Sequence, residues 1–250
     1  AAGLALTGHV AYTGSFAVFG TGRAYDQIRN TVCYSNLDVK ICPTHAGVSV
    51  GPDGGSHQML EDVSLMRGLP NMRVLVPADY AAARAAIKLA AKTPGPVYVR
   101  MGRAAVPCVY DDDVELELGR AYVLREGTDA TVVACGVEIR EALAAADALA
   151  EEGISIEVID AFSVKPLDED TITASVAKTG CCVVAEEHSV HGGLGSAVAE
   201  CLARKNPAPC EFVGVEDRFG KSGEFEELLG YFNLDAAAIV EAVKRAMGRK

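Results

Sequence analysis

The sequence lacks the signatures of several protein classes. No apolar run approaches the roughly 18 residues that a membrane-spanning helix needs, and no basic stretch followed by an apolar one resembles a secretory signal. The sequence has no G-x-x-x-x-G-K-[ST] phosphate loop and no serine in a nucleophile elbow. These absences argue against a membrane protein, a secreted protein, a P-loop nucleotide-binding protein and an α/β-hydrolase.

C-x-x-C pairs are also missing, although the chain has eight cysteines. Four of them, Cys42, Cys135, Cys181 and Cys182, lie inside apolar runs that are typical of strands. We therefore expect buried free thiols rather than a disulfide framework. Free thiols favour a reducing compartment, so we expect a cytoplasmic protein.

Positive charge is scarce after residue 104. Residues 1–104 carry ten Lys and Arg against six Asp and Glu, a net charge of +4. The remaining residues carry 13 basic and 28 acidic side chains, a net charge of −15. The acidic part is a poor partner for nucleic acid, and the basic part suits an anionic small molecule. Solvated helix faces that differ in charge would give the same asymmetry.

What the sequence does contain is a repeated alternation of apolar runs and amphipathic segments. We expect an extended segment at 9–19 and strands at 39–46, 72–77, 96–101, 130–137, 155–159, 181–187 and 210–215. We expect helices within 20–37 and at 59–69, 80–92, 138–152, 195–204 and 234–247, with a further helix starting at Pro166. This alternation predicts an α/β fold with two domains, each a mostly parallel sheet flanked by helices.

An irregular, acidic stretch interrupts the alternation at residues 104–118. We interpret it as the crossing between domains, which predicts the boundaries 1–110, 111–124 and 125–250 for the first domain, an acidic linker region and the second domain. The first eight residues look like the last two turns of a helix that ends at the glycine C-cap Gly8. We therefore expect the first domain to be truncated at its N-terminus.

The richest candidate site is the glycine-rich loop at residues 44–58, which holds His45, Asp53 and His57. It follows the strand expected at 39–46, and open α/β sheets bind ligands at the carboxyl ends of their strands. Ordinary turn chemistry would also explain the sequence Gly-Pro-Asp-Gly-Gly, with histidines that are structural or face solvent. The spacing matches no compact metal motif, so we expect no metal ligands here.

Two further pairs of side chains lie near strand ends. Phe16 and Phe19 are three residues apart, either as core residues or as rings that stack on a ligand. Arg100 and Arg103 lie at and just after the end of the strand expected at 96–101, at the same sheet edge as the glycine-rich loop. Because guanidinium groups are costly to leave unpaired, a phosphate or a carboxylate is their natural partner.

The sequence Gly192-Gly193-Leu194-Gly195 resembles a dinucleotide-binding turn between a strand and a helix. Val198 occupies the third glycine position, and no acidic residue follows a fitting second strand about 20 positions later. We therefore favour a tightly packed helix start over a nicotinamide site.

Five segments together resemble the transketolase family: SFAVF, GRAYDQIRN, THAGVSVGPDGGSHQMLED, RGLPNMRVLVPAD and PVYVRMGR. The likeness is strongest to the separate C-terminal subunit of a split transketolase, and it covers nearly the whole chain. The first half resembles the family's pyrimidine-binding domain. The part from Arg125 onward, with HGGLGSAVAE and DRFGKSGEFEELL, resembles the transketolase C-terminal domain.

This resemblance implies a thiamine diphosphate enzyme that transfers a two-carbon ketol group between sugar phosphates, as in the pentose phosphate pathway. Phe16 and Phe19 would line the pocket for the aminopyrimidine ring of the cofactor. The residues that would contact the sugar phosphate are His45, Asp53, His57, Arg103 and, as a further candidate, Arg100. Of these, the two histidines would be the catalytic candidates.

The resemblance also implies a partner, the N-terminal subunit that binds the diphosphate and holds most of the contacts to a Mg2+ or Ca2+ ion. The family's catalytic glutamate would lie just before Ala1, and a third ring-lining aromatic is missing, with Gly22 nearby. We expect a homodimer or a heterotetramer that binds neither nucleic acid nor membrane. If the cofactor contacts are divided between chains, residues 1–104 should expose apolar surface that is buried on assembly.

Three alternatives stay open. A 1-deoxyxylulose-5-phosphate synthase shares the RAYDQ segment and also binds sugar phosphates. The beta subunit of a 2-oxo acid dehydrogenase would have no reason to keep His45 and Arg103 for a phosphate. In the third alternative, the chain is a module that folds and dimerises but catalyses nothing.

Overall fold

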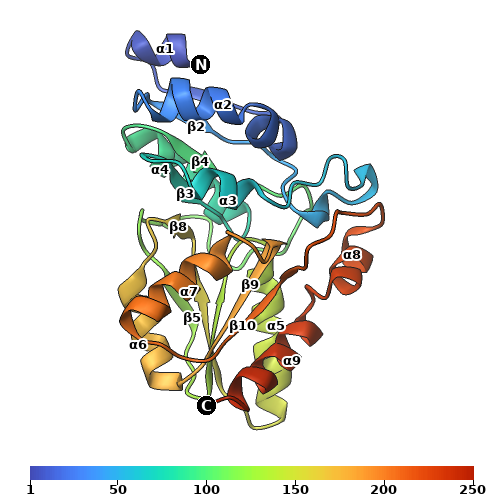
Figure 1. Ribbon diagram of the computed structural model, residues 1–250. Coiled ribbons are helices and arrows are strands. Elements are labelled where there is room, and N and C mark those ends of the chain that lie inside the picture. The colour runs from blue at the N-terminus through green and yellow to red at the C-terminus, as the bar shows by residue number, and fades with distance from the viewer.

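Two five-stranded sheets organise the chain, and the computed structural model describes all 250 residues (Figure 1). The first sheet has the order β1 (Ala11–Thr13), β2 (Val39–Ile41), β4 (Val97–Val99), β3 (Arg73–Leu75) and β8 (Ser163–Lys165). The second has the order β10 (Cys210–Val215), β9 (Cys182–Ser189), β6 (Ala130–Ala134), β7 (Ile156–Asp160) and β5 (Tyr122–Arg125). All neighbouring strands are parallel except β3 with β8 and β5 with β7.

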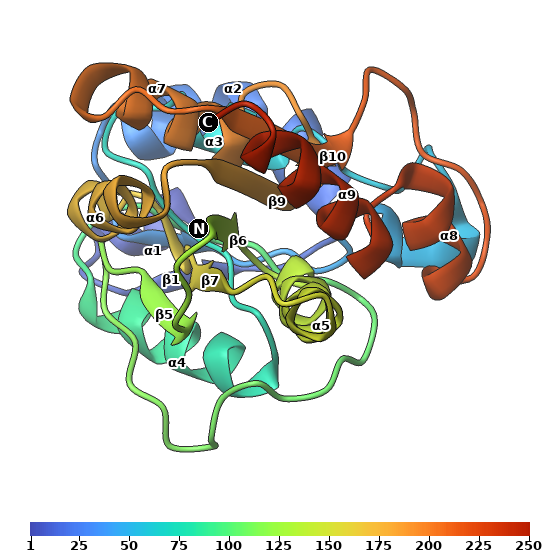
Figure 2. The same cartoon turned by 90° about the horizontal axis from the view of Figure 1, so that it is seen from below.

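Helices cover both sheets. Those of the first part are α1 (Ala2–Leu6), η1 (Val18–Arg23), α2 (Tyr25–Gln27), η2 (Ile28–Cys33), η3 (Val48–Asp53), α3 (Asp62–Arg67) and α4 (Tyr80–Lys92); η1 and η2 are π-helical, and η3 is a pair of 3-10 turns kinked at Gly51. Those of the second part are α5 (Glu138–Glu151), α6 (Glu169–Thr179), α7 (Leu194–Lys205), α8 (Phe225–Phe232) and α9 (Ala236–Met247). In Figure 2, α5 and α9 lie on one side of the second sheet and α6 and α7 on the other. The predicted fold class is therefore confirmed.

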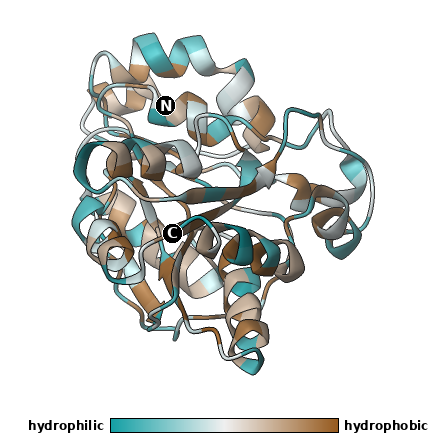
Figure 3. Ribbon diagram, turned by 60° about the horizontal axis from the view of Figure 1, so that its bottom comes forward, coloured by the Kyte–Doolittle hydropathy of each residue, from teal (hydrophilic) through white to brown (hydrophobic).

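Buried apolar side chains of the two domains pack against each other. Every residue of β4, β6 and β7 is buried, as expected for parallel strands that are covered on both faces. In Figure 3, brown hydrophobic segments run through the inside of the molecule and teal hydrophilic ones lie mostly on its outer helices and loops. A single cluster of buried side chains joins Val74 and Tyr98 of the first sheet to Val133 and Ile159 of the second. Because this cluster crosses the boundary, the second domain is packed firmly against the first.

Strong local signals in the sequence predicted their elements well. The helix α4 begins and ends at the predicted residues, and its N-cap, Asp79, accepts a hydrogen bond from the Ala82 N–H at 2.8 Å. The strand β10 has the predicted bounds. Cys42, Cys135, Cys181 and Cys182 are all buried, as predicted.

Several boundaries and elements differ from the prediction. The helix expected from Pro166 begins at Glu169, because Asp168 caps it by accepting the Thr171 N–H at 3.1 Å. The segment expected to be extended at 9–19 contains β1 but turns helical at Val18. The elements β5, β8 and α8 were not predicted. Because β5 begins at Tyr122, the stretch 111–124 contains the start of a strand of the second sheet, and the domain boundaries remain a prediction.

The connecting segment between the domains is fastened to both of them. The Asp79 carboxylate accepts the backbone N–H groups of Val109 and Tyr110 at 2.6 and 2.9 Å. On the other side, the Tyr110 hydroxyl donates to Asp160 at 2.7 Å, while the second carboxyl oxygen of Asp160 is buried without a partner. Burial, opposed by the Tyr110 hydrogen bond and reinforced by the charge of Asp79, raises the pKa of Asp160 to about 7.

We expect Asp160→Asn to stabilise the protein at pH 8 by up to about 4 kcal/mol, and to have little effect near pH 4. The folded state holds the Asp160 proton up to a pKa of about 7, above the usual value of 3.8, so stability falls as the pH rises between these values and is flat above them. Asparagine removes this dependence and still accepts the Tyr110 hydroxyl. Thermal unfolding from pH 4 to 8 measures the effect, with exposed Asp112→Asn as control. Equal shifts at all pH values would contradict the assignment.

Candidate active site

The backbone of the glycine-rich loop brings a histidine onto an aromatic ring. Thr44 forms a parallel β-bridge with Phe16, in the same register as β1 and β2 and three residues beyond their last pair. The next residue, His45, has a φ of +63°, a conformation that is uncommon for a residue with a side chain. The imidazole of His45 stacks on the ring of Phe16 with a centroid distance of 3.8 Å and an angle of 10° between the planes.

Four of the predicted site residues form one cluster of rings. The centroids of Phe16 and Phe19 lie 6.1 Å apart with nearly parallel planes. The imidazole of His57 contacts both rings edge-on, at 5.9 Å from Phe16 and 5.4 Å from Phe19. The side chains of all four residues, including His45, are only partly buried. Their partial exposure favours a surface that stacks on a ligand over a purely structural core.

Charged side chains from two other positions act on this cluster. Burial and the charge of Arg103 lower the pKa of His45, and the charge of Asp53 opposes this shift. Arg103 and Asp53 are exposed. The Arg103 guanidinium donates one hydrogen bond, to the Val50 carbonyl at 3.3 Å, and the Asp53 carboxylate accepts none within the chain. The site therefore combines a neutral imidazole with a cation and a carboxylate whose hydrogen-bonding groups are largely free.

We expect Arg103→Ala to raise the pKa of His45 and Asp53→Asn to lower it further, because each change removes one of the two charges that act on the imidazole. An NMR titration of the histidine ring protons, assigned with His45→Gln, measures both shifts. Arg84→Ala, an exposed position on α4, is the control. A His45 pKa that is unchanged in Arg103→Ala would show that the guanidinium does not act on this ring.

Arg100 differs from the other candidates because a carboxylate of the chain already pairs with its guanidinium, and its role in substrate binding stays a prediction. Its side chain is buried, and its Nε and Nη2 atoms donate to the two carboxyl oxygens of Asp62 at 2.8 and 3.3 Å. Nη2 also donates to the Glu187 carbonyl at 2.8 Å, and the hydroxyl of buried Tyr98 donates to Asp62. Burial alone would raise the pKa of Asp62, but the Arg100 charge lowers it overall. The guanidinium already has the carboxylate partner that the sequence could not locate.

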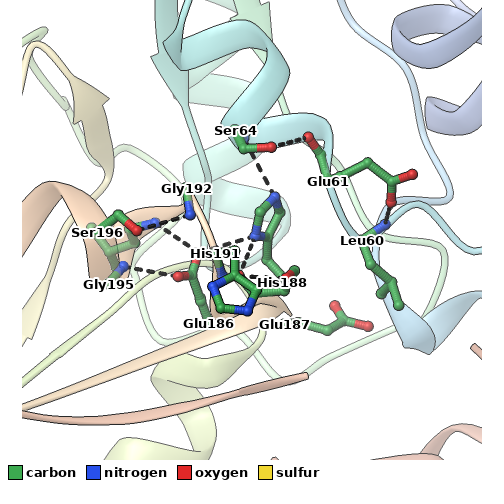
Figure 4. Close-up of polar contacts among 12 residues, drawn as sticks. Leu60, Glu61, Ser64, Glu186, Glu187, His188, His191, Gly192, Gly195 and Ser196 are labelled. Carbon is green, nitrogen blue, oxygen red and sulfur yellow. Dashed lines mark hydrogen bonds and ion pairs between the residues drawn. The ribbon is translucent and has the colours of Figure 1, made fainter. Parts of the chain in front are cut away.

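A carboxylate of the protein already binds the backbone N–H groups of the Gly192–Gly195 turn. The Glu186 carboxylate accepts the N–H groups of Leu194 and Gly195 at 2.7 and 2.8 Å, at the first turn of α7 (Figure 4). Beside it, His188 Nε2 lies 3.4 Å from the Ser64 N–H. A phosphate at this helix start would have to displace a buried carboxylate, so the structure supports the tightly packed helix start that the sequence favoured.

Sequence reasoning missed two residues that support the site. The guanidinium carbon of Arg23, at the end of η1, lies 4.5 Å from the ring centroid of Phe19, and its N–H groups make no hydrogen bond within the chain. Gln58 follows His57 directly and is buried. The segment GRAYDQIRN contains Arg23, but nothing in the spacing of its residues places that guanidinium on an aromatic ring.

Two further features concern metals and membranes. No group of three or more His, Cys, Asp or Glu side chains has an arrangement that could hold a metal ion. None of the helices combines the length and the hydropathy that crossing a bilayer demands.

Comparison with known proteins identifies relatives of the whole chain. The family described as "Transketolase, pyrimidine binding domain" matches residues 1–109, and "Transketolase, C-terminal domain" matches residues 119–239. The 6-deoxy-6-sulfo-D-fructose transketolase subunit SqwH of Clostridium sp. (strain MSTE9) is 43% identical over all of this chain and 78% of its own length. An apulose-4-phosphate transketolase subunit of Phocaeicola vulgatus is 38% identical over 95% of this chain and 76% of its own length.

A solved structure resembles the chain over its full length. It is described as "Split gene transketolase, inactive beta4 tetramer" and superposes with a TM-score of 0.95 at 50% identity. The match covers 100% of this chain and 80% of that one.

Proposed function

We propose, since this chain belongs to the transketolase family, that it is the C-terminal subunit of a split enzyme in the cytoplasm, which transfers a two-carbon ketol group between sugar phosphates. The observation that carries the proposal is the convergence of His45, His57, Asp53 and Arg103 beside two stacked phenyl rings. A ketose phosphate offers a phosphate, several hydroxyl groups and a reacting carbonyl. The charged and polar side chains of the site can form hydrogen bonds with the phosphate and with the hydroxyl groups.

Arg103 and His45 would bind the anionic end of the substrate. A guanidinium with free donors suits a phosphate, and a neutral imidazole can donate one further hydrogen bond. In this role His45 Nδ1, 2.7 Å from the Thr44 hydroxyl, accepts that O–H and leaves Nε2–H for the ligand. The names of two relatives refer to a sulfo sugar and a sugar phosphate, and we extend an anionic end group to the substrate of this chain.

Asp53 and His57 would act nearer to the reacting carbons. The free Asp53 carboxylate can accept a substrate hydroxyl and so read the configuration at that carbon. The Nδ1 atom of His57 lies 3.0 Å from the Ser56 hydroxyl, which leaves Nε2 to bond a hydroxyl of the donor or to move a proton.

Membership in the family implies thiamine diphosphate, and the chain offers a fitting surface for its pyrimidine ring. Phe16 and Phe19 present partly exposed, nearly parallel faces beside the proposed substrate groups, as a flat heteroaromatic ring requires. When bound, this cofactor supplies the carbanion that adds to the ketose carbonyl and allows the C2–C3 bond to break. The partner subunit would hold the diphosphate and the Mg2+ or Ca2+ ion.

Exposed apolar side chains on the first part of the chain support a partner. The large hydrophobic side chains that are exposed among residues 1–104 are Leu4, Leu6, Val10, Tyr12, Tyr34 and Tyr80. Apolar side chains that are exposed on a subunit can be buried when it associates with a partner. We therefore propose that this part of the chain docks onto the diphosphate-binding subunit, in a heterotetramer with two copies of each chain.

A choice of substrates tests the reaction type. The chain is mixed with a diphosphate-binding subunit, thiamine diphosphate and Mg2+, and given xylulose 5-phosphate with ribose 5-phosphate. The proposal expects two-carbon transfer. Condensation of pyruvate with glyceraldehyde 3-phosphate would favour the deoxyxylulose phosphate synthase, and decarboxylation of a 2-oxo acid without an aldose would favour the dehydrogenase subunit. No turnover with any of these, even after the family's glutamate segment is added before Ala1, would favour the non-catalytic module.

A further inference from the structure

A segment of the second domain lies directly against the glycine-rich loop. Residues 218–224, which lead into α8, run beside η3 in both Figure 1 and Figure 2. A Cβ atom on Gly54 would lie 2.4 Å from the Ser222 Oγ, and one on Gly55 would lie 2.6 Å from the Gly220 carbonyl oxygen. Gly55 is therefore needed because a backbone from the other domain approaches so closely, and Gly54 leaves room for the Ser222 side chain.

Gln58 joins the two backbones by hydrogen bonds. Its buried side-chain amide lies within donating distance of the Val48, Gly51 and Lys221 carbonyls, at 3.1, 3.3 and 2.9 Å. The first two acceptors belong to the loop, and the third belongs to the second domain. Because His57 precedes Gln58, this connection fixes the end of the loop that carries the proposed proton-moving group.

Glu187 holds the opposite end of the loop. Its carboxylate, at the end of β9, accepts the Ser49 N–H and, at 3.1 Å, the Ser49 hydroxyl. A Cβ atom on Gly47, whose φ is +81°, would lie 2.2 Å from the Glu187 carboxyl carbon. The second domain therefore makes hydrogen bonds to the loop on both sides of the turn that carries Asp53.

From the hydrogen bonds of Gln58 and Glu187 we propose that the second domain holds the glycine-rich loop in place and so sets the positions of its site residues. We also propose that Gln58 is a positioning residue for substrate binding by His45, Asp53 and His57. This inference rests on the proposed function. A glycine-rich loop loses much backbone entropy on ordering, and a displacement of about 1 Å can cost 100-fold in rate at a site that binds by oriented polar groups. Contacts with the second domain, which lie outside the site, offset the backbone entropy that the loop loses on ordering.

The test replaces Gln58 by methionine in the full chain. Methionine has a similar volume and lacks the donors, and the amide oxygen that it also removes is buried without a partner. The matched control is Gln27→Met, since Gln27 is the other glutamine of the chain and is exposed on α2. Hydrogen exchange measured by mass spectrometry on the chain alone reports the order of residues 44–58. Steady-state kinetics of the complex with the partner subunit report KM and kcat.

We expect Gln58→Met to exchange faster in the loop, with exchange in the sheets unchanged, and to raise KM for the ketose phosphate about 10-fold with thiamine diphosphate affinity unchanged. Gln27→Met should change neither. Unchanged hydrogen exchange in the loop would contradict the claim that Gln58 orders it. Faster exchange without a change in KM would contradict the claim that Gln58 positions the substrate-binding residues. If the unmutated complex, with the family's glutamate segment added before Ala1, transfers no two-carbon unit, the proposed function fails, while the exchange data still decide whether Gln58 orders the loop.

Discussion

Replacing Arg103 by alanine is expected to lower kcat/KM for a ketose phosphate about 100-fold in the complex with the partner subunit, chiefly through KM. Arg103 is exposed, and one hydrogen bond of 3.3 Å to the Val50 carbonyl is its contact within the chain. Its remaining donors are therefore available to a phosphate. Losing a charge-assisted contact of this kind costs on the order of 2–3 kcal/mol, which corresponds to the stated factor.

An unphosphorylated ketose separates this role from a general defect. The alanine variant and the unmutated enzyme should differ little with such a donor, because neither then binds a phosphate. Arg84→Ala, which removes an exposed arginine from α4, should leave the kinetics of both donors unchanged. An equal loss with both donors would contradict the assignment of Arg103 to the phosphate.

Replacing Arg100 by alanine is expected to destabilise the folded chain by about 3–5 kcal/mol, since the change leaves the carboxylate of Asp62 buried and without its cation. The carboxylate would keep the Tyr98 hydroxyl as a partner. The Glu187 carbonyl would also lose one of the hydrogen bonds that link β9 to the first domain. Urea unfolding followed by circular dichroism measures the loss.

The double variant Asp62→Asn, Arg100→Met tests the cause. Removing both charges together avoids the uncompensated carboxylate, so we expect most of the stability to return. A single alanine variant within about 1 kcal/mol of the unmutated protein would mean that water or another group replaces the guanidinium, and that the buried pair is not what holds this boundary together.

The elements that sequence alone predicted are those whose signals are local. Asp79 and the alanine-rich stretch after it specify α4 without help from the rest of the chain, and the apolar run of β10 does the same. The strand β8 has no such signal, because its three residues become a strand only by pairing with β3 across the domain boundary. The helix start at Glu169 depended on a choice between Pro166 and Asp168, which the side-chain cap decided.

In the candidate site, too, local patterns identified some residues, whereas contacts that are distant in the chain could not be predicted. The ring pair Phe16 and Phe19 and the loop histidines could be selected because they follow strands that end at one edge of a sheet. Arg100 occupies an equally suitable place in the sequence, and its carboxylate partner, Asp62, lies 38 positions away.

The contacts of the second domain with the site could not be predicted from the sequence, because they join residues that are far apart in the chain. Gln58 and Glu187 contact residues that are 163 and 138 positions distant in the chain. No pattern of spacing along the chain carries that information, since each contact exists only after both domains have packed.

A titration tests most directly whether this chain supplies one half of a shared active site. The chain is added in steps to a fixed amount of the diphosphate-binding subunit, with saturating thiamine diphosphate and Mg2+, and two-carbon transfer from xylulose 5-phosphate is measured at each step. We expect no transfer by either protein alone and a rate that rises to a plateau at one chain per partner subunit. Full activity of the partner alone, or no activity at any ratio even after the family's glutamate segment is added before Ala1, would show that the active site is not shared in this way.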